Sequence, residues 1–552
     1  MMASQLASSS PFSLVSGQIR AALPCHLPQR APCRPFPASS SASSCLLPGE
    51  LHASELRAPP PAAISGKMWA AFSAEVWVAR RSSVRTKRAA FSSEMSVARA
   101  STAASVAEFP KAWRAISSSC FSASPSSVVP ITAGRGSIDF RADLNHPYAG
   151  SSLSTDEVIG HAASASKARA ARINARLAHA LGKGLSAADV RLAPLSDQGH
   201  SLTVGIGTPP QPHTLIVDTG SDLIWTQCRL FRCTARQREP LYDPRGSSSF
   251  AFLPCSSRLC QEGQFSDKNC TRNRCLYDDV YGSAEAGGVL ASDTFTFAGK
   301  VSLPLGFGCG ALSAGSLVGA SGLMGLSPGT MSLISQLSIP RFSYCLTPFA
   351  ERKTSPLLFG AMANLQKYKT TGPIQTTDIL SNPAMMETPY YYVPLVGLSL
   401  GTNRLRVPAA SLAMKPDGTG GTIVDSGSTL SYLPENVFKV LKKAVLETVR
   451  FPVVNGTIED YELCFALPRG AAMSAVKTPR LVLHFDGGAA MVLPRDNYFQ
   501  EPRAGVMCLA VGSAPDGFGV SIIGNVQQQN MHVLFDVRNQ KFSFAPTQCE
   551  DI

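Results

Sequence analysis

The sequence predicts an all-β protein with minor helices, built from two homologous lobes. From Ser201 onward, short apolar runs alternate with Gly, Pro, Asn and Ser, which is the pattern of short strands joined by turns. The stretches LIVDTGSD (215–222) and TIVDSGST (422–429) are nearly identical, and they place Asp218 and Asp425 207 positions apart (425 − 218). Such an internal repeat indicates two related halves.

A second pair of matching elements supports the repeat. GLMG (322–325) follows the first acid, and IIG (522–524) follows the second acid at a similar distance. The two halves are expected to join within 365–390, where prolines interrupt the pattern. The clearest helix of the second half is expected over 435–449, directly after Pro434.

The amino-acid composition is that of a globular protein with a hydrophobic core. The chain has 552 residues, of which 44% are apolar and 16% are charged. Residues 1–135 carry 14 Lys/Arg against 5 Asp/Glu, which accounts for 9 of the net 12 positive charges. The remainder is nearly neutral, so a nucleic-acid partner is not expected. No run of 18 apolar residues occurs, so no membrane span is expected.

The N-terminal extension, residues 1–135, is expected to be disordered or processed. It is rich in Ser, Ala, Arg and Pro and has no acidic residue before Glu50, a composition shared by organelle transit peptides. A compact apolar core of a secretory signal is hard to find; the best candidate lies within 116–133 and is interrupted by Ser and Pro. A wrongly assigned start codon is a third explanation.

Residues 136–190 have a different character. A short strand is expected over 140–144, and residues 155–157 (TDE) are placed to cap a helix that runs to Leu181. The helix carries four cations, Lys167, Arg169, Arg172 and Arg176. One interpretation is a solvated basic helix, and the other is a segment whose cations pair with the two repeated acids until low pH releases them.

The chemistry is expected at the two repeated turns. Each turn places one carboxylate at the end of a buried apolar run, with a Gly two residues later. A single Asp-Thr-Gly is most often a capped turn. If two homologous turns meet on a pseudo-two-fold axis, however, the carboxylates of Asp218 and Asp425 lie side by side and cannot both ionise. One then stays protonated while the other acts as a base.

Several motifs resemble those of pepsin-like aspartic proteases, and in particular the plant nepenthesin-like subfamily. The resemblance extends from Leu192 to Cys549. The motifs are DTGS (218–221) and DSGS (425–428) for the family, and DTGSDLIWTQC (218–228), SSSF (247–250), FGCG (307–310), FSYC (342–345) and IGNVQQQN (523–530) for the subfamily. The resemblance implies a bilobal pepsin-like fold with two β-barrel-like lobes and an active site in the cleft between them.

The resemblance also implies a mechanism and a set of roles. Asp218 and Asp425 would activate a water that hydrolyses a peptide bond at acidic pH, with no metal, cofactor or covalent nucleophile. The expected substrates are proteins or peptides, and the expected state is a monomer. Six neighbours would support the pair: Gly220 and Gly427, Thr219 and Ser426 bonding across the pseudo-axis, and Ser221 and Ser428 contacting the outer carboxylate oxygens.

Substrate would be closed in by a flap. Tyr281 resembles the flap tyrosine and Trp225 the residue behind it, although either is also compatible with plain β core. The family commonly shows Tyr-Gly-Asp-Gly-Ser-x-Thr-x-Gly-x-Leu. The present stretch, YGSAEAGGVL (281–290), is one residue shorter and lacks the Asp and the Thr. Substrate preference is therefore expected to differ.

Eleven of the 15 cysteines lie between Cys228 and Cys549, a density that suggests disulfides and an oxidising compartment. A zinc site is the weaker alternative, because the spacings are not C-x-x-C and no His accompanies them. The resemblance implies five pairs: Cys233–Cys309, Cys255–Cys275, Cys260–Cys270, Cys345–Cys549 and Cys464–Cys508. Cys228 is then left over, and we expect it to be a free thiol.

Other motifs carry weaker signals. GLSPG (325–329) matches the Gly-x-Ser-x-Gly turn of serine hydrolases, but Pro328 suits that turn badly. The nine histidines show no metal-ligand spacing. Asn269 and Asn455 head glycosylation sequons, which matter only in the secretory pathway. We expect that pathway to deliver the protein to the extracellular space, apoplast or vacuole; the alternative is the plastid.

The sequence is accordingly divided into an N-terminal extension (1–135), a propeptide (136–190), an N-terminal catalytic lobe (191–370) and a C-terminal catalytic lobe (371–552). The leading hypothesis is an aspartic endopeptidase. The rival is a catalytically silent binding protein of the same fold, resembling the xylanase inhibitors that have lost catalytic residues. Both Asp218 and Asp425 are present with their Gly and hydroxyl neighbours, which favours the enzyme.

Overall fold

The computed structural model describes residues 138–146, 154–181, 199–231, 236–281, 284–315, 317, 319–349, 351, 353–385, 388–456, 458–514 and 519–552. The expected N-terminal extension, 1–135, lies outside these residues. Most of the described regular structure is β, with few helices, as the sequence predicts.

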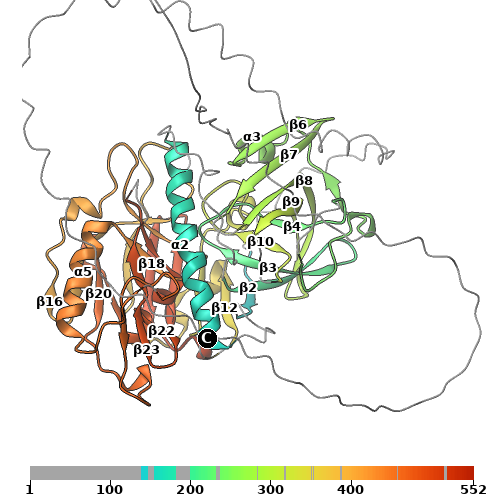
Figure 1. The fold of residues 1–552 in the computed structure, drawn as a ribbon. Coiled ribbons are helices and arrows are strands. Elements are labelled where there is room, and N and C mark those ends of the chain that lie inside the picture. The colour runs from blue at the N-terminus through green and yellow to red at the C-terminus, as the bar shows by residue number, and fades with distance from the viewer. Residues whose placement is uncertain are drawn as a thin grey trace, which may run out of the picture. The chain divides into compact units, whose positions relative to one another are not determined.

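The first lobe is built on a nine-stranded sheet (Figure 1). Its strands lie in the order β2-β3-β10-β4-β9-β8-β7-β6, and β5 pairs with β8. Two short helices, α3 (Arg258–Glu262) and α4 (Leu333–Gln336), accompany it. The strands are β2 Ser201–Ile206, β3 Gln211–Asp218, β4 Trp225–Gln227, β5 Ala251–Phe252, β6 Asp267–Thr271, β7 Arg274–Val280, β8 Ala284–Phe297, β9 Val301–Gly315 and β10 Gly322–Gly325.

The second lobe contains three smaller sheets, coloured orange and red in Figure 1, and the helices α5 (Glu435–Thr448) and α6 (Asn525–Gln528). The sheets have the orders β14-β17-β25-β18-β24, β16-β15-β20-β21 and β19-β23-β22. The strands are β14 Tyr392–Val393, β15 Leu395–Leu400, β16 Asn403–Arg404, β17 Thr422–Val424, β18 Ser431–Leu433, β19 Cys464–Ala466, β20 Leu481–Phe485, β21 Ala490–Leu493, β22 Phe499–Arg503, β23 Val506–Leu509, β24 Val511–Ser513 and β25 Ser521–Ile523.

A six-stranded sheet that sequence analysis did not anticipate joins segments from both halves. Its order is β1-β12-β11-β26-β27-β13, and its strands are β1 Arg141–Leu144, β11 Phe342–Cys345, β12 Ser355–Phe359, β13 Gln375–Asp378, β26 Met531–Asp536 and β27 Lys541–Pro546. β11 pairs antiparallel with β26, although the two strands are far apart in sequence. One continuous cluster of buried apolar side chains extends from this sheet into both lobes.

The repeated stretches fold in the same way in both halves. β3 pairs in parallel with β10, so that Asp218 lies opposite Gly325. β17 pairs in parallel with β25, and Asp425 follows β17 directly. All three residues of β17, and the last six of β3, are buried. Each strand thus carries a short apolar run just before its acid, LIV (215–217) or IV (423–424), as strands buried on both faces do.

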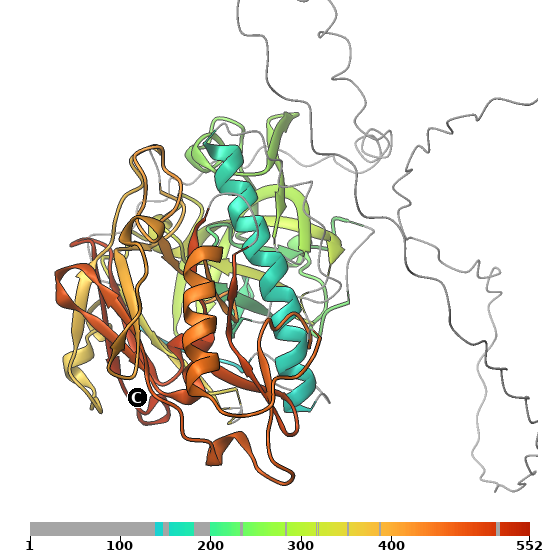
Figure 2. The ribbon, with the colours of Figure 1, turned by 60° about the vertical axis from the view of Figure 1, so that its left-hand side comes forward.

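Helix α2 (Thr155–Ala180), drawn in teal, lies between the green first lobe and the orange and red second lobe in Figure 1, and Figure 2 shows the same helix after a turn of the molecule. Ser154 and Glu157 form a reciprocal capping box, with Ser154 N–H and Oγ donating to Glu157 Oε2 and Glu157 N–H donating to Ser154 Oγ. The cap is thus one residue earlier than expected. Ile159, Ala163, Ala170, Ile173 and Leu177 pack in one cluster with Ile423 and Tyr432 of the second lobe.

The interpretation of α2 as a solvated basic helix is therefore wrong. Arg169 and Arg172 are 3% and 5% exposed. The sequence did not reveal this, because a helix enclosed between two lobes can bury some of its cations together with its alanines.

Five disulfides occur among the described residues, and two of them, Cys345–Cys549 and Cys464–Cys508, are those that the resemblance implies. The expected Cys255–Cys275 and Cys260–Cys270 pairs are wrong: the structure has Cys255–Cys270 and Cys260–Cys275. β6 and β7 form a hairpin in which Cys270 lies opposite Cys275. The buried Cys260 and Cys275 pair with each other, which leaves the outer two to pair. The zinc alternative is excluded for these four thiols.

The expected Cys233–Cys309 pair and free Cys228 are also wrong. Cys228 is bonded to Cys309, with Cα atoms 5.3 Å apart. β4 lies beside β9 in parallel register, and the N–H of Cys228, just past β4, donates to Gly310 O (2.8 Å), which places the two thiols together. Cys233 lies outside the described residues.

Within the described part of the chain, no helix is long and apolar enough to cross a membrane.

Candidate active site

Two turns, one at the end of β3 and one after β17, bring Asp218 and Asp425 together. Both carboxylates are fully buried. A Cβ added to Gly220 would lie 2.5 Å from Asp425 Oδ1, and one added to Gly427 would lie 2.5 Å from Asp218 Oδ1. Any side chain at either glycine would therefore collide with the opposite carboxylate, and this close approach explains why both turns carry Gly.

Each carboxylate is held by its own turn in the same way. The Gly220 N–H donates to Asp218 Oδ1 (2.8 Å), and the Gly427 N–H donates to Asp425 Oδ1 (3.0 Å). Ser221 and Ser428 donate to the outer oxygens, Asp218 Oδ2 and Asp425 Oδ2, each at 2.5 Å. The contacts have the geometry that the resemblance implies, and they orient both inner oxygens toward each other's loop.

Thr219 and Ser426 lock the two loops across the pseudo-axis. The Ser426 N–H donates to Thr219 Oγ1 (2.9 Å), and the Thr219 N–H donates to Ser426 Oγ (3.1 Å). Each hydroxyl also donates to a backbone carbonyl of the opposite strand, Val424 O (3.2 Å) or Val217 O (3.4 Å). This exchange leaves neither loop free to shift without breaking buried hydrogen bonds.

The residues that follow the second pair of repeated elements, GLMG (322–325) and IIG (522–524), hydrogen-bond to the two catalytic loops. The Ser327 N–H donates to Ser221 O (3.1 Å), and the Asn525 N–H donates to Ser428 O (2.7 Å) at the equivalent place in the other half. Ser327, the serine of the GLSPG stretch, is buried. Ser327 therefore has a structural role, because its N–H supports the Asp218 loop. This role was not predicted from the sequence.

Arg169 of α2 contacts both carboxylates. Its Nη2 lies 2.7 Å from Asp218 Oδ1 and 3.0 Å from Asp425 Oδ1, while its Nε lies 2.8 Å from Asp425 Oδ2. The side chain is 4% exposed. One guanidinium therefore neutralises the dyad through charge-assisted hydrogen bonds. The sequence marked four cations on this helix but did not single out Arg169.

The environment makes the two acids unequal. Burial raises the pKa of Asp218, the charge of Arg169 only partly offsets it, and the nearby Asp425 raises it further. Burial also acts to raise the pKa of Asp425, but the charge and hydrogen bonds of Arg169 and the hydrogen bond from Ser428 bring it below its ordinary value. One acid of the pair therefore holds its proton more firmly than the other.

The predicted flap corresponds to the antiparallel pair of β7 and β8, and Tyr281 lies directly after β7. Tyr281 is 3% exposed, and its ring lies 6.1 Å from that of Trp225 in a stacked arrangement. Tyr281 also lines a pocket beside α2, together with Arg169, Arg172, Ile173, Arg176, Gly220, Ser221, Val280 and Tyr390. Tyr281 thus lies beside the Asp218 loop, and Trp225 contacts the ring of Tyr281.

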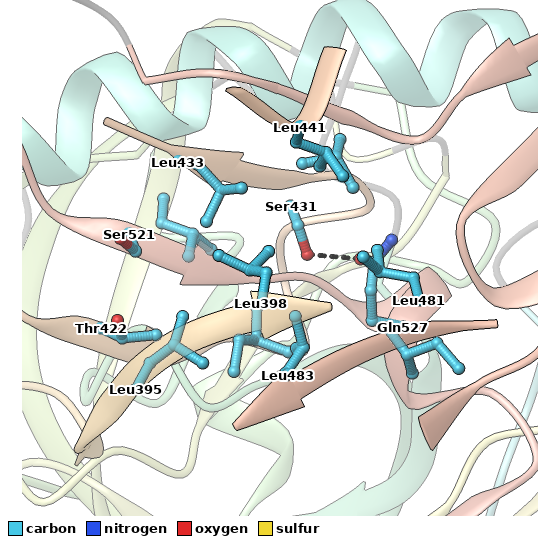
Figure 3. Close-up of a pocket in the computed structure, with 14 residues that line it drawn as sticks. Leu395, Leu398, Thr422, Ser431, Leu433, Leu441, Leu481, Leu483, Ser521 and Gln527 are labelled. Atoms are coloured by element: carbon cyan, nitrogen blue, oxygen red, sulfur yellow. Dashed lines mark hydrogen bonds between the residues drawn. The ribbon is translucent and has the colours of Figure 1, made fainter. Parts of the chain in front are cut away.

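A second pocket lies inside the second lobe and contains none of the candidate site residues (Figure 3). Most of its lining is aliphatic, including Leu395, Leu433 and Leu483, and its one drawn hydrogen bond runs from Ser431 Oγ to Gln527 Oε1. We assign it to the core of that lobe. The remaining predicted positions, Asn269 and Asn455, are exposed on the surface. No group of His, Cys, Asp or Glu suited to a metal occurs among the described residues.

Comparison with known proteins identifies similar chains. Residues 200–361 match the family described as Xylanase inhibitor N-terminal, and residues 390–546 match Xylanase inhibitor C-terminal. Aspartic proteinase nepenthesin-1 of Nepenthes gracilis is 40% identical over 414 residues, which cover 74% of this chain and 90% of that protein. Aspartic proteinase nepenthesin-2 of the same plant is 36% identical over 412 residues, with the same coverage.

Two further comparisons agree with these. Aspartyl protease 37 of Oryza sativa subsp. japonica is 35% identical over 383 residues, which cover 63% of this chain and 79% of that protein. The crystal structure of edgp superposes with a TM-score of 0.50 at 18% identity, covering 64% of this chain and 93% of that chain. At that identity the likeness concerns the fold alone.

Proposed function

We propose, from the premise that this chain belongs to the aspartic proteinase family of the nepenthesins and is an aspartic endopeptidase, that Asp218 and Asp425 are its catalytic pair. The observation that carries the proposal is the single nitrogen, Arg169 Nη2, within 3.0 Å of both inner oxygens. A polar atom at that point can form hydrogen bonds with both carboxylates at once. The attacking water must do the same.

In the proposed mechanism a water takes the position of Arg169 Nη2 once α2 has left the cleft. The ionised carboxylate accepts a proton from this water as the oxygen attacks the peptide carbonyl. The protonated carboxylate donates a hydrogen bond to the oxyanion that develops on the carbonyl oxygen. Because one acid must be charged and the other neutral, activity is confined to the acid side of neutrality.

The segment 136–190 is proposed to be a propeptide that keeps the enzyme inactive. Arg169 occupies the dyad, and α2 fills the space between the lobes through its buried apolar residues. The segment also contributes β1, which pairs with β12 at the edge of the six-stranded sheet. A substrate cannot reach the two carboxylates while this helix is in place.

The rival function, a silent binding protein, is disfavoured by the completeness of the site. Both acids, both glycines and all four supporting hydroxyls have partners that suit catalysis. The site is formed within one chain, which supports a monomer. The five disulfides support entry into the secretory pathway rather than the plastid. Asn269 and Asn455 are then exposed candidates for glycosylation.

The test is to replace each acid with its amide. Asp218→Asn and Asp425→Asn preserve volume but remove the shared proton, so we expect kcat/KM for acid proteolysis to fall by at least about 10³-fold in each variant. Asp378→Asn, at an exposed carboxylate paired with Lys541, serves as the control and should keep full activity. Wild-type turnover by either folded dyad variant would overturn the assignment.

A further inference from the structure

A second cation of α2, Arg176, lies two helical turns after Arg169, about 10 Å further along the helix. Its Nη2 donates to the backbone carbonyl of Gln264 (2.7 Å) and lies 3.7 Å from Asp279 Oδ2. The Arg176 side chain is 22% exposed, whereas that of Asp279 is fully buried. Arg176 also lines the pocket that contains Ser221 and the flap residue Tyr281. A guanidinium therefore occupies a built site inside the cleft.

The orientation of Asp279 is fixed by the catalytic part and not by α2. Its Oδ1 accepts hydrogen bonds from Ser266 Oγ (2.9 Å) and from the N–H of Val280 (3.0 Å). Among the described residues its buried Oδ2 has no hydrogen-bond partner and faces Arg176 only as an ion pair. The carboxylate thus keeps its direction when α2 leaves, and it then presents an unpaired oxygen to the cleft.

A second buried acid, Asp222, lies within electrostatic range of both Arg176 and Asp279. Asp222 is 6% exposed and accepts a hydrogen bond from the Met331 N–H (3.4 Å). Burial raises the pKa of Asp222 to about 6, the charge of Arg176 opposes the rise, and the charge of Asp279 adds to it. Removing Arg176 leaves the buried Asp279 carboxylate without a cation beside it, and an uncompensated buried charge is costly unless another cation enters.

We propose that Asp279, assisted by Asp222, forms a subsite of the processed enzyme that takes an arginine or lysine side chain of the substrate. This inference rests on the proposed proteolytic function. Arg176 acts as a mimic of that substrate side chain. Because an extended chain advances about 3.3 Å per residue, the basic residue is expected roughly three positions from the scissile bond. Arg should be preferred to Lys, since its planar group can reach a carboxylate and the Gln264 carbonyl at once.

The experiment uses the processed enzyme and a neutral peptide that it cleaves. A single Arg is moved through the four positions on each side of the scissile bond, and every peptide has a partner with citrulline, which has the same shape without the charge. We expect one position at which kcat/KM for Arg exceeds that for citrulline by about 10-fold or more.

Two enzyme variants assign the preference to a residue. Asp279→Asn keeps an oxygen acceptor for Ser266 and Val280, and it should reduce the Arg-to-citrulline ratio to nearly one. Asp278→Asn is the matched control, because alternation along β7 places its side chain on the opposite, partly exposed face. It should leave the ratio unchanged. The wild-type ratio tests the proposal even if Asp279→Asn does not fold.

The outcomes separate this inference from the proposed function. Cleavage of neutral peptides with no advantage for Arg at any position would refute the subsite and leave the protease intact. A preference for Arg that survives in folded Asp279→Asn would also refute it. If Asp218→Asn or Asp425→Asn retained activity, the proposed function itself would fall, and the subsite with it.

Discussion

Thr219 and Ser426 make each catalytic loop depend on the other. Thr219→Val keeps the shape of the side chain but leaves the Ser426 N–H and the Val424 carbonyl without their buried partner. Since an unsatisfied buried group costs about 1 to 3 kcal/mol, we expect the free energy of unfolding to fall by about 2 kcal/mol. Denaturant unfolding measures this change, and kcat should fall as well because the carboxylates lose their alignment.

A second buried threonine serves as the control for that substitution. Thr226 is also fully buried, but its hydroxyl makes one long hydrogen bond, to Ser321 O at 3.4 Å. Thr226→Val should therefore cost less stability and leave kcat unaffected. Equal losses of kcat in the two variants would argue against a specific role for Thr219.

At the scale of single residues, the sequence predicted the positions that belong to the duplicated motif. The acids, glycines and hydroxyls follow one another within each turn, so local order fixed their places. The expected partner of Cys255 and the expected free thiol of Cys228 were wrong, because pairing depends on which strands become neighbours and which thiols are buried. The role proposed for Asp279 could not be predicted from the sequence, since the sequence does not show whether an acid on a strand faces solvent or a cleft.

Among the elements, α2 is the one that we propose keeps the enzyme inactive, and Arg169→Met tests this proposal. Asp425 has its pKa lowered in the docked state, so this part of the docking free energy is present above its ordinary value of 3.8 and is lost as pH falls through the lowered pKa. The charge of Arg169 also acts to lower the pKa of Asp218 against the rise caused by burial, so this contact likewise favours docking while the acid is ionised. The variant loses the Arg169 contacts, so we expect it to convert to the mature form at higher pH and at least about 10-fold faster.

The control for this experiment lies on the same helix. Lys167 pairs with Asp460 at 3.3 Å, and both side chains are about 40% exposed, so the pair contributes little. Lys167→Met should convert like the wild-type chain when processing is followed by gel electrophoresis over a pH series. If both variants convert alike, loss of a surface charge, and not of the dyad contact, controls release.

At the scale of elements, local signals predicted the helices better than the sheets. The capping residues and alanines of α2, and Pro434 before α5, act through neighbouring residues. The six-stranded sheet escaped prediction because its strands come from the propeptide segment, the middle and the last third of the chain. Nothing in the short strand β11 indicates which distant strand completes it.

For the molecule as a whole, buried histidines make the free energy of unfolding decrease as the pH falls. Burial lowers the pKa of His532 to about 4, and also lowers that of His200 to about 3 and that of His213 to about 4. An unfolded His titrates near 6.5, so stability is fully present above that pH and is lost as pH falls toward 4. For His532 the loss amounts to about 3 kcal/mol at pH 4.

His532→Gln should flatten this dependence. We expect the difference in unfolding free energy between pH 6.5 and pH 4 to shrink by about 3 kcal/mol, whatever the variant costs at neutral pH. Urea unfolding in an Asp425→Asn background avoids self-digestion during the measurement. His161→Gln, at a partly exposed position on α2, is the control. An unchanged pH dependence in His532→Gln would show that other groups dominate.

The pairing of β11 with β26 also has a consequence for synthesis on the ribosome. Ser343 and His532, which touch across these strands, are 189 residues apart. At 5 to 20 residues per second, the first lobe waits about 10 to 40 s with the edge of β11 open before β26 emerges. An open strand edge invites pairing with other chains. Slow codons or a stall between the two strands should therefore increase aggregation of the nascent protein, which makes the timing of translation part of its folding.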